Sequence, residues 1–231
     1  MTPSEATRLH YLNAMGITIW QSRFSSESIA SESAPIIFVE NSVALATDAW
    51  KNLQTDVSNC QLCNLCTTRT QTVFGEGNES AKWLFVGEAP EQEENGQSYP
   101  FIGESRELLT EMLRAMNLTP EDVFITNILK CSTPENQNPH AAEIKQCRNY
   151  LQRQITLIQP KIIIAIGRIA AQTLLETTEK IGTLRQQIHY VENIPLIAIY
   201  HPSYLLRSLI EKRKAWQDLQ FALQTFKTLT D

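Results

Sequence analysis

The sequence between residues 162 and 176 reads IIIAIGRIAAQTLLE. Its first five residues are all apolar, which is typical of a short strand buried on both faces inside a parallel sheet. A glycine follows at position 167, and residues 168–176 then have the apolar and polar pattern expected of a helix. A buried strand that passes directly into a helix is the repeating unit of α/β proteins.

The same alternation recurs on either side of this stretch. Short apolar runs bounded by turn residues predict three further strands, at Trp83–Val86, Val123–Thr126 and Leu196–Tyr200. Apolar positions with helical spacing predict helices across residues 105–116, 144–158 and 216–226. We therefore expect an α/β fold, a three-layer α/β/α sandwich with a central four-stranded parallel sheet.

The composition is that of a globular protein. Of 231 residues, 42% are hydrophobic and 19% are charged, which is too apolar for a disordered chain. No apolar run reaches the roughly 18 residues of a membrane span, and the first 12 residues do not resemble a secretion signal. We therefore expect a cytoplasmic protein with no membrane partner. The net charge of −5 argues against a basic nucleic-acid-binding domain, although a local basic patch can still bind phosphate.

The chain is expected to divide near residue 56. Residues 1–56 hold six acidic and three basic residues, and the serine-rich stretch at 25–36 is typical of a linker. The regular alternation of strands and helices begins only after Val57. We therefore expect an N-terminal extension at 1–56 and one domain at 57–231.

The five cysteines favour a metal site over disulfides. Cys60, Cys63 and Cys66 are spaced three apart, and Cys131 and Cys147 follow much later. A zinc ribbon usually has two close pairs, whereas one close pair with two dispersed cysteines is compatible with a 4Fe–4S cluster. The spacing leaves both metals open. It also leaves open that Cys131 and Cys147 are small buried hydrophobic residues.

Polar and small residues follow three of the expected strands, at the edge where α/β proteins bind ligands. The stretch Gly87-Glu88-Ala89-Pro90 follows the first, Asn127 follows the second and His201 follows the last. Each has a structural alternative, such as a solvated loop, a turn or a cap. A basic cluster that could bind phosphates comes soon after: Arg207, Lys212, Arg213 and Lys214.

Together these motifs resemble the family 4 uracil-DNA glycosylases, the iron–sulfur type. The resemblance spans about residues 57–225. It rests on stretches that occur in the order Cys60-x2-Cys63, Val73-Phe74-Gly75-Glu76-Gly77, Gly87-Glu88-Ala89-Pro90, Pro100-Phe101-Ile102-Gly103, Ile125-Thr126-Asn127, Lys130-Cys131, Cys147-Arg148 and His201-Pro202-x-Tyr204-Leu205-Leu206-Arg207.

The resemblance implies a DNA repair enzyme that flips uracil out of DNA and hydrolyses its N-glycosidic bond. It also implies a 4Fe–4S cluster on Cys60, Cys63, Cys131 and Cys147, with Cys66 left out. In that family pattern, Phe101 stacks on the base, Asn127 reads its edge, His201 binds uracil O2, and Leu205 fills the vacated stack. The implied roles are catalytic for Glu88, Glu94 and His201, substrate-binding for Gly87, Ala89, Phe101 and Asn127, and DNA-binding for Leu205 and Arg207.

The sequence departs from the family pattern beside the expected pocket. Glu91 stands where the Gly-Glu-Ala-Pro-Gly loop of the family has its second glycine, and Asn95 and Ser98 replace an aspartate and a glycine. An extra carboxylate there would repel DNA phosphates and the departing base. The alternative is therefore a DNA- or repair-partner-binding protein of the same fold with weak or no excision. A zinc protein with unrelated chemistry is a third hypothesis.

A second, shorter resemblance concerns the N-terminal extension. Residues 8–23 read RLHYLNAMGITIWQSR and are similar to the N-terminal peptide of the bacterial polymerase III psi subunit, which docks on the clamp loader. The resemblance implies a contact with the replication clamp loader. The alternative is that these residues pack on the glycosylase-like domain.

Overall fold

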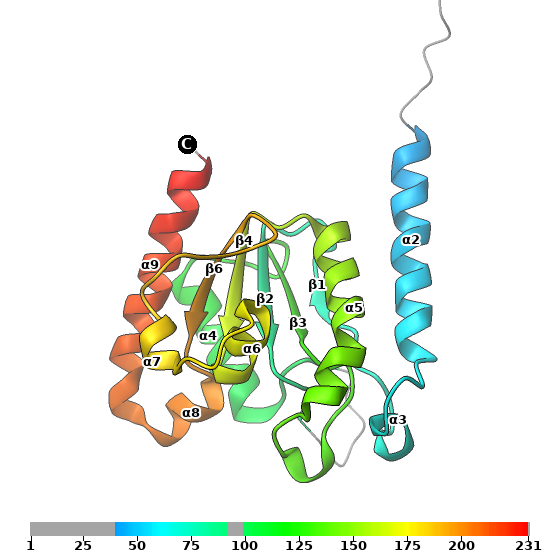
Figure 1. Cartoon of the computed structure of the whole chain (residues 1–231). Helices are drawn as coiled ribbons and strands as arrows, with labels where there is room; N and C mark the ends of the chain where they lie inside the picture. The colour runs from blue at the N-terminus through cyan, green and yellow to red at the C-terminus, as the bar shows by residue number, and fades with distance from the viewer. Residues whose placement is uncertain (1–39, 92–98, 231) are drawn as a thin grey trace, which may run out of the picture. The chain divides into compact units, whose positions relative to one another are not determined.

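The computed structural model describes residues 40–91 and 99–230, which contain one six-stranded sheet (Figure 1). In the order in which they lie in the sheet, the strands are β1 (Glu76–Gly77), β3 (Val123–Asn127), β2 (Trp83–Gly87), β4 (Ile162–Ile166), β6 (Ile194–Ile199) and β5 (His189–Val191). The inner strands β3, β2, β4 and β6 are parallel to one another, which confirms the predicted centre of the sheet.

The sequence does not predict the two outer strands. Both run antiparallel to their neighbours, β1 beside β3 and β5 beside β6. They are two and three residues long and their side chains are at most half-buried, so no apolar run marks them. The sheet therefore has six strands and mixed edges, where four parallel strands were expected.

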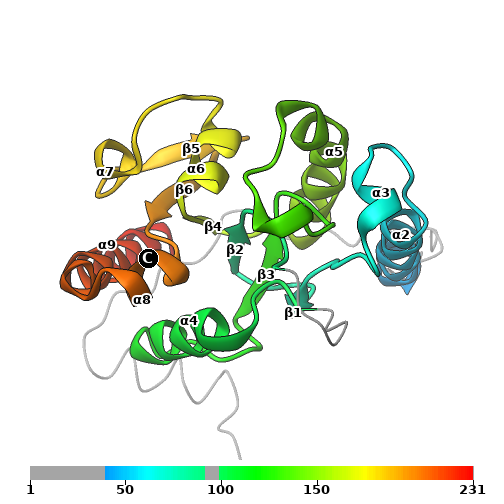
Figure 2. The same ribbon diagram turned by 90° about the horizontal axis from the view of Figure 1, so that it is seen from below.

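Two helical layers cover the sheet and confirm the three-layer sandwich (Figure 2). Successive strand residues point to opposite faces, so Trp83 and Phe85 pack in one core and Leu84 and Val86 in the other. The first core contains residues of α4 (Gly103–Ala115) and α9 (Lys212–Thr230), and the second contains residues of α5 (Ala141–Ile158) and α6 (Arg168–Leu175). Each large apolar side chain buried in these layers contributes about 1.5–3 kcal/mol to folding.

Helix α2 (Glu40–Ser58) crosses the expected division at residue 56. Its residues Trp50, Leu53 and Val57 are buried. The Trp50 ring packs edge-on against Phe74, with the ring centroids 5.1 Å apart. The compact unit begins at Glu40, and the peptide at 8–23 lies outside the described residues.

The remaining helices are short: α3 (Leu65–Thr68), α7 (Ile181–Leu184), α8 (Pro202–Arg207) and the 3-10 turns η1 (Pro134–Asn136) and η2 (Leu209–Glu211). None of the helices in the described ranges is long and apolar enough to cross a membrane.

Candidate active site at the strand ends

The carboxyl ends of the four inner strands bring the predicted site residues to one edge of the sheet. Gly87 and Asn127 end β2 and β3 and are direct partners in the ladder. His201 follows β6 after one residue. A cleft of about 400 Å³ opens at this edge, and its lining includes Glu88, Ala89, Glu91, His201, Ser203 and Arg207.

Asn127 presents a buried oxygen that lacks a hydrogen-bond partner. Its side chain is 1% exposed, and its Nδ2 donates to the carbonyl oxygen of Pro100 at 2.9 Å. Its Oδ1 accepts from no group within residues 40–91 and 99–230. A buried acceptor without a hydrogen bond destabilises the fold by about 1–3 kcal/mol. Oδ1 can therefore accept a hydrogen bond from a ligand.

Gly87 allows Phe101 and Asn127 to approach the same point. A Cβ atom at position 87 would lie 2.2 Å from Oδ1 of Asn127 and 2.6 Å from Cζ of Phe101. The Phe101 ring is buried, and its centroid lies 5.4 Å from that of the His201 ring. Oδ1 of Asn127 and the Phe101 ring therefore lie together against the backbone of Gly87, and the His201 imidazole lies beside the Phe101 ring.

His201 caps the start of α8. Its Nδ1 accepts the backbone N–H of Ser203 at 3.2 Å and lies 2.8 Å from the Ser203 hydroxyl. Burial, with a smaller effect from the positive charge of Arg207, lowers the pKa of His201 to about 4. The ring is therefore neutral at neutral pH, and because Nδ1 is an acceptor, its proton is on Nε2, which can donate.

Two backbone hydrogen bonds hold the start of the loop after β2. The carbonyl oxygens of Gly87 and Glu88 accept the N–H groups of Ile128 and Leu129 at 2.9 and 3.0 Å. Burial raises the pKa of Glu88, while the nearby Arg168 opposes this rise. Glu94, the other predicted acidic residue, lies outside the described residues.

The four cysteines predicted as ligands come together in one pocket. Cys60, Cys63, Cys131 and Cys147 line it, and Cys66 does not. Cys60 and Cys63 lie between α2 and α3, and Cys147 is on α5. All five cysteines are free thiols.

Two N–H groups point at these sulfur atoms. Arg69 donates from Nη1 to Sγ of Cys131 at 3.0 Å, and the backbone N–H of Lys130 donates to Sγ of Cys147 at 3.3 Å. Burial raises the pKa values of the Cys63 and Cys131 thiols, and it raises the pKa of the Cys147 thiol to about 11. Within the described residues, no three acidic, histidine or cysteine side chains are arranged to hold a single metal ion.

Lys130 is a buried residue near the site that no sequence pattern marks as such. Its side chain is 1% exposed, and its Nζ donates to Thr126, Asn127 and Gln154. Burial lowers its pKa to about 7, and the nearby Cys147 opposes this shift. The only sequence signal is the Lys130-Cys131 pair, which does not reveal burial.

Comparison with known proteins agrees with this arrangement. Residues 74–220 match the family model of the uracil DNA glycosylase superfamily, a stretch that includes Gly87, Phe101, Asn127 and His201. A type-4 uracil-DNA glycosylase from Archaeoglobus fulgidus is 42% identical over 160 residues, which is 65% of this chain and 80% of the relative. The chain belongs to the type-4 uracil-DNA glycosylase family.

Further relatives carry the same family name. A type-4 uracil-DNA glycosylase from Saccharolobus solfataricus is 39% identical over 160 residues, covering 65% of this chain and 74% of the relative. Another, from Thermotoga maritima, is 37% identical over 155 residues, covering 66% of this chain and 80% of the relative.

One residue that the glycosylase resemblance assigned to DNA lies in the protein core. Leu205 is 1% exposed and packs in the apolar layer that contains α4 and α9. The wedge role that the resemblance implies for Leu205 stays a prediction. Leu209 and Ile210, farther along this segment, are 66% and 86% exposed. Arg207 is exposed, and its predicted contact with DNA stays a prediction.

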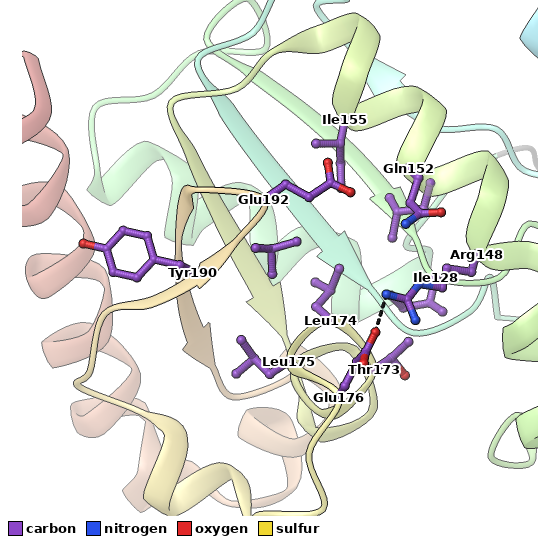
Figure 3. A pocket seen from close by; sticks show the side chains of 12 residues that line it. Ile128, Arg148, Gln152, Ile155, Thr173, Leu174, Leu175, Glu176, Tyr190 and Glu192 are labelled. Atoms are coloured by element: carbon purple, nitrogen blue, oxygen red, sulfur yellow. Dashed lines mark ion pairs between the residues drawn. The ribbon is translucent and has the colours of Figure 1, made fainter.

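A second hollow of about 300 Å³ lies away from the glycosylase site, between α5, α6 and β5 (Figure 3). Ile128, Ile155 and Leu174 contribute apolar side chains to it, and an ion pair between Arg148 and Glu176 crosses it. None of the predicted catalytic, substrate-binding or cysteine residues lines it.

Proposed function

We propose that this type-4 family member releases uracil from DNA by hydrolysing the bond between the base and deoxyribose. The observation that carries the proposal is the unpaired Oδ1 of Asn127, buried beside Phe101 and Gly87. Uracil has a proton on N3, whereas cytosine has a lone pair there. An acceptor at Oδ1 therefore pairs with uracil and repels cytosine.

The base can reach Asn127 only after it leaves the DNA stack, because base flipping brings the target into a pocket. In the proposed complex, the flipped base lies beside the Asn127 amide, and the ring of Phe101 stacks on it. Arg207 lines the cleft, and the exposed cations Lys212 and Arg213 follow at the start of α9. In the proposed complex these three residues contact phosphates.

His201 stabilises the charge that develops on the base. As the glycosidic bond breaks, uracil gains negative charge, much of it on O2. The neutral His201 ring donates from Nε2, and no proton has to be lost or gained first. Removal of one such donor typically lowers a rate by about 10²–10³-fold.

Glu88 supplies the negative charge near the sugar. A carboxylate at the mouth of the cleft orients the attacking water or stabilises the oxocarbenium-like sugar. Because burial raises the pKa of Glu88, the carboxylate is lost on acidification at a higher pH than an exposed glutamate would require. Glu94 is proposed as a second acidic residue of the reaction, on the basis of the family pattern alone.

We further propose that Cys60, Cys63, Cys131 and Cys147 hold a 4Fe–4S cluster. The donor set fits: four thiols line one apolar pocket, and N–H groups already point at two of the sulfurs. When bound, the cluster supplies metal–sulfur bonds that cross-link these segments.

The experiment that tests the function is release of free uracil from a labelled oligonucleotide by the purified full chain, after its iron content has been measured. Excision of uracil, with no release from the matching cytosine oligonucleotide, supports the proposal. Absence of uracil release by iron-loaded protein contradicts it. A colourless protein that contains zinc contradicts the cluster.

One observation favours a second candidate function, a DNA- or repair-partner-binding protein with weak excision. Glu91 lines the cleft, at the position where the family loop has glycine. In this reading the protein binds uracil-containing DNA as tightly as an active glycosylase but turns it over slowly.

The remaining proposals concern partners and location. Residues 8–23 are proposed to contact the replication clamp loader, and the cytoplasm remains the expected location. A pull-down with purified clamp loader tests the contact, with Trp20→Ala as the comparison. Loss of binding in the variant supports it, and equal retention or no retention of the two proteins contradicts it.

A further inference from the structure

Lys130 is a buried lysine to which the excision chemistry above gives no role. Its Nζ lies 2.6 Å from Oγ1 of Thr126, 2.8 Å from the carbonyl oxygen of Asn127 and 2.6 Å from Oε1 of Gln154. In its protonated form the amine has three protons, and each of them has one of these acceptors. The group is therefore fully satisfied inside the protein and fixed in three directions.

The acceptors are themselves anchored to a separate segment. Oγ1 of Thr126 and Nε2 of Gln154 each lie 2.9 Å from the carbonyl oxygen of Phe74. Gln154 is fully buried on α5, and Thr126 is buried in β3. The ammonium thus joins the end of β3 to a helix and to the chain that leads into β1.

Asn127 receives one of the three hydrogen bonds on its own backbone. The Asn127 side chain is attached to the same backbone unit, so a hydrogen bond that fixes the Asn127 carbonyl also restricts the position of Oδ1. The side-chain hydrogen bond to Pro100 fixes the other end of the amide. Loss of the ammonium would remove one donor from each of three buried acceptors and would loosen the strand end.

We propose that Lys130 is a positioning residue for base recognition, because its ammonium fixes the backbone from which Asn127 presents Oδ1 to uracil. The inference rests on the proposed function of Asn127. Lys130 stays outside the reaction, since all three of its protons are used within the protein. The backbone N–H of Lys130 also donates to Cys147, so the same residue connects base recognition to the cysteine pocket.

The test compares wild type, Lys130→Met and Met116→Ala. Methionine keeps most of the apolar stem and removes all three hydrogen bonds. Met116 is buried at the end of α4, before the chain enters β3 and therefore at the opposite end of that strand from the site. It serves as a control for general destabilisation. Steady-state kinetics, inhibition by free uracil, iron content and amide hydrogen exchange of residues 123–131 are measured for each protein.

For Lys130→Met we expect kcat to fall by about 10–10²-fold, the effect of a small misplacement. The inhibition constant of free uracil should rise about 10-fold, KM for DNA should change by less than about 3-fold, and hydrogen exchange should accelerate at 123–131. Iron content should stay at the wild-type level. Met116→Ala should lose stability with unchanged kcat and uracil inhibition. If Lys130→Met does not fold, Gln154→Leu removes one acceptor and should move the same readouts in the same direction by less.

Two results overturn the inference in different ways. If wild type excises uracil and a folded Lys130→Met, or Gln154→Leu in its place, matches it in kcat and uracil inhibition, the positioning role is wrong and the proposed function stands. The same conclusion follows if kcat falls only in proportion to lost iron. If iron-loaded wild type releases no uracil, the proposed function fails and the recognition role of Lys130 fails with it.

Discussion

The backbone of Gly87 lies so close to the side chain of Asn127 that a Cβ atom at position 87 would stand 2.2 Å from Oδ1. The two residues are ladder partners at the ends of neighbouring parallel strands. The unpaired acceptor therefore exists in this position only because residue 87 has no side chain.

Gly87→Ala should displace the Asn127 amide and the Phe101 ring, which also lies within 3 Å of the added atom. We expect uracil excision to fall by about 10²-fold, as misplacement by about 1 Å can cause. The control is Gly182→Ala, because a Cβ atom at that helical glycine meets nothing within 4 Å. The measurement is the single-turnover rate of uracil excision by each variant and by wild type. Equal activity in Gly87→Ala and wild type would show that the close contact is irrelevant to excision.

His201 should make the fold less stable in acid. Its pKa is lowered to about 4 in the folded chain, against about 6.5 in an unfolded one. Between these values the unfolded state binds a proton that the folded state does not, so stability falls as the pH decreases through this window. From pH 7 to pH 5 the loss due to His201 should be on the order of 1–2 kcal/mol.

The measurement is urea unfolding of wild type and His201→Gln at both pH values. The decrease in stability between pH 7 and pH 5 should be smaller in the variant, because glutamine does not titrate. An identical decrease in the two proteins would mean that His201 is not the group responsible.

Cys63→Ala should lose most of the iron and much of the stability, whereas Cys66→Ala should retain both. Cys63 lines the pocket with the other three proposed ligands, and Cys66 does not, although both lie in the same short stretch. Iron per chain, visible absorption and the thermal midpoint are compared for the two variants. Equal iron in both would refute the proposed ligand set.

Glu91→Gly should raise excision if the carboxylate restrains the enzyme through its charge. Glu91 lines the cleft, where its charge acts on DNA phosphates and on the departing base. The gain should be largest at low salt, because screening weakens such effects as the Debye length shortens to about 8 Å at physiological ionic strength. Steady-state rates across a salt series test this. A rate unchanged at every ionic strength would show that the substitution is neutral.

Much of the fold could be predicted because its centre obeys simple rules. The four inner strands are buried along their length except at the first residue of β6, so their apolar runs are visible in the sequence. Their parallel direction then places Asn127 and His201 at one edge of the sheet. Strands β1 and β5 form because they pair with the outermost of the inner strands of the sheet and not because they contain an apolar run, so no sequence pattern predicts them.

The limits of prediction at the site have a physical cause as well. From the sequence, Lys130 would be expected to be exposed to solvent, because lysine is almost never fully buried unless it is paired. Its hydrogen-bond partners include a residue as distant in the chain as Gln154. The burial of Leu205, which results from the packing of α8 against α4, is likewise not visible in the sequence. Both outcomes depend on contacts between elements that no local spacing encodes.

The most direct measurement is single-turnover release of uracil, by wild type and by His201→Ala, from oligonucleotides that carry one uracil or one cytosine at the same position. We expect wild type to release uracil and no cytosine. His201→Ala should be slower by about 10²–10³-fold, the loss expected for one donor to the developing anion, with DNA affinity little changed. Equal release of uracil by the two proteins, or no release by an iron-loaded wild type, would contradict the account.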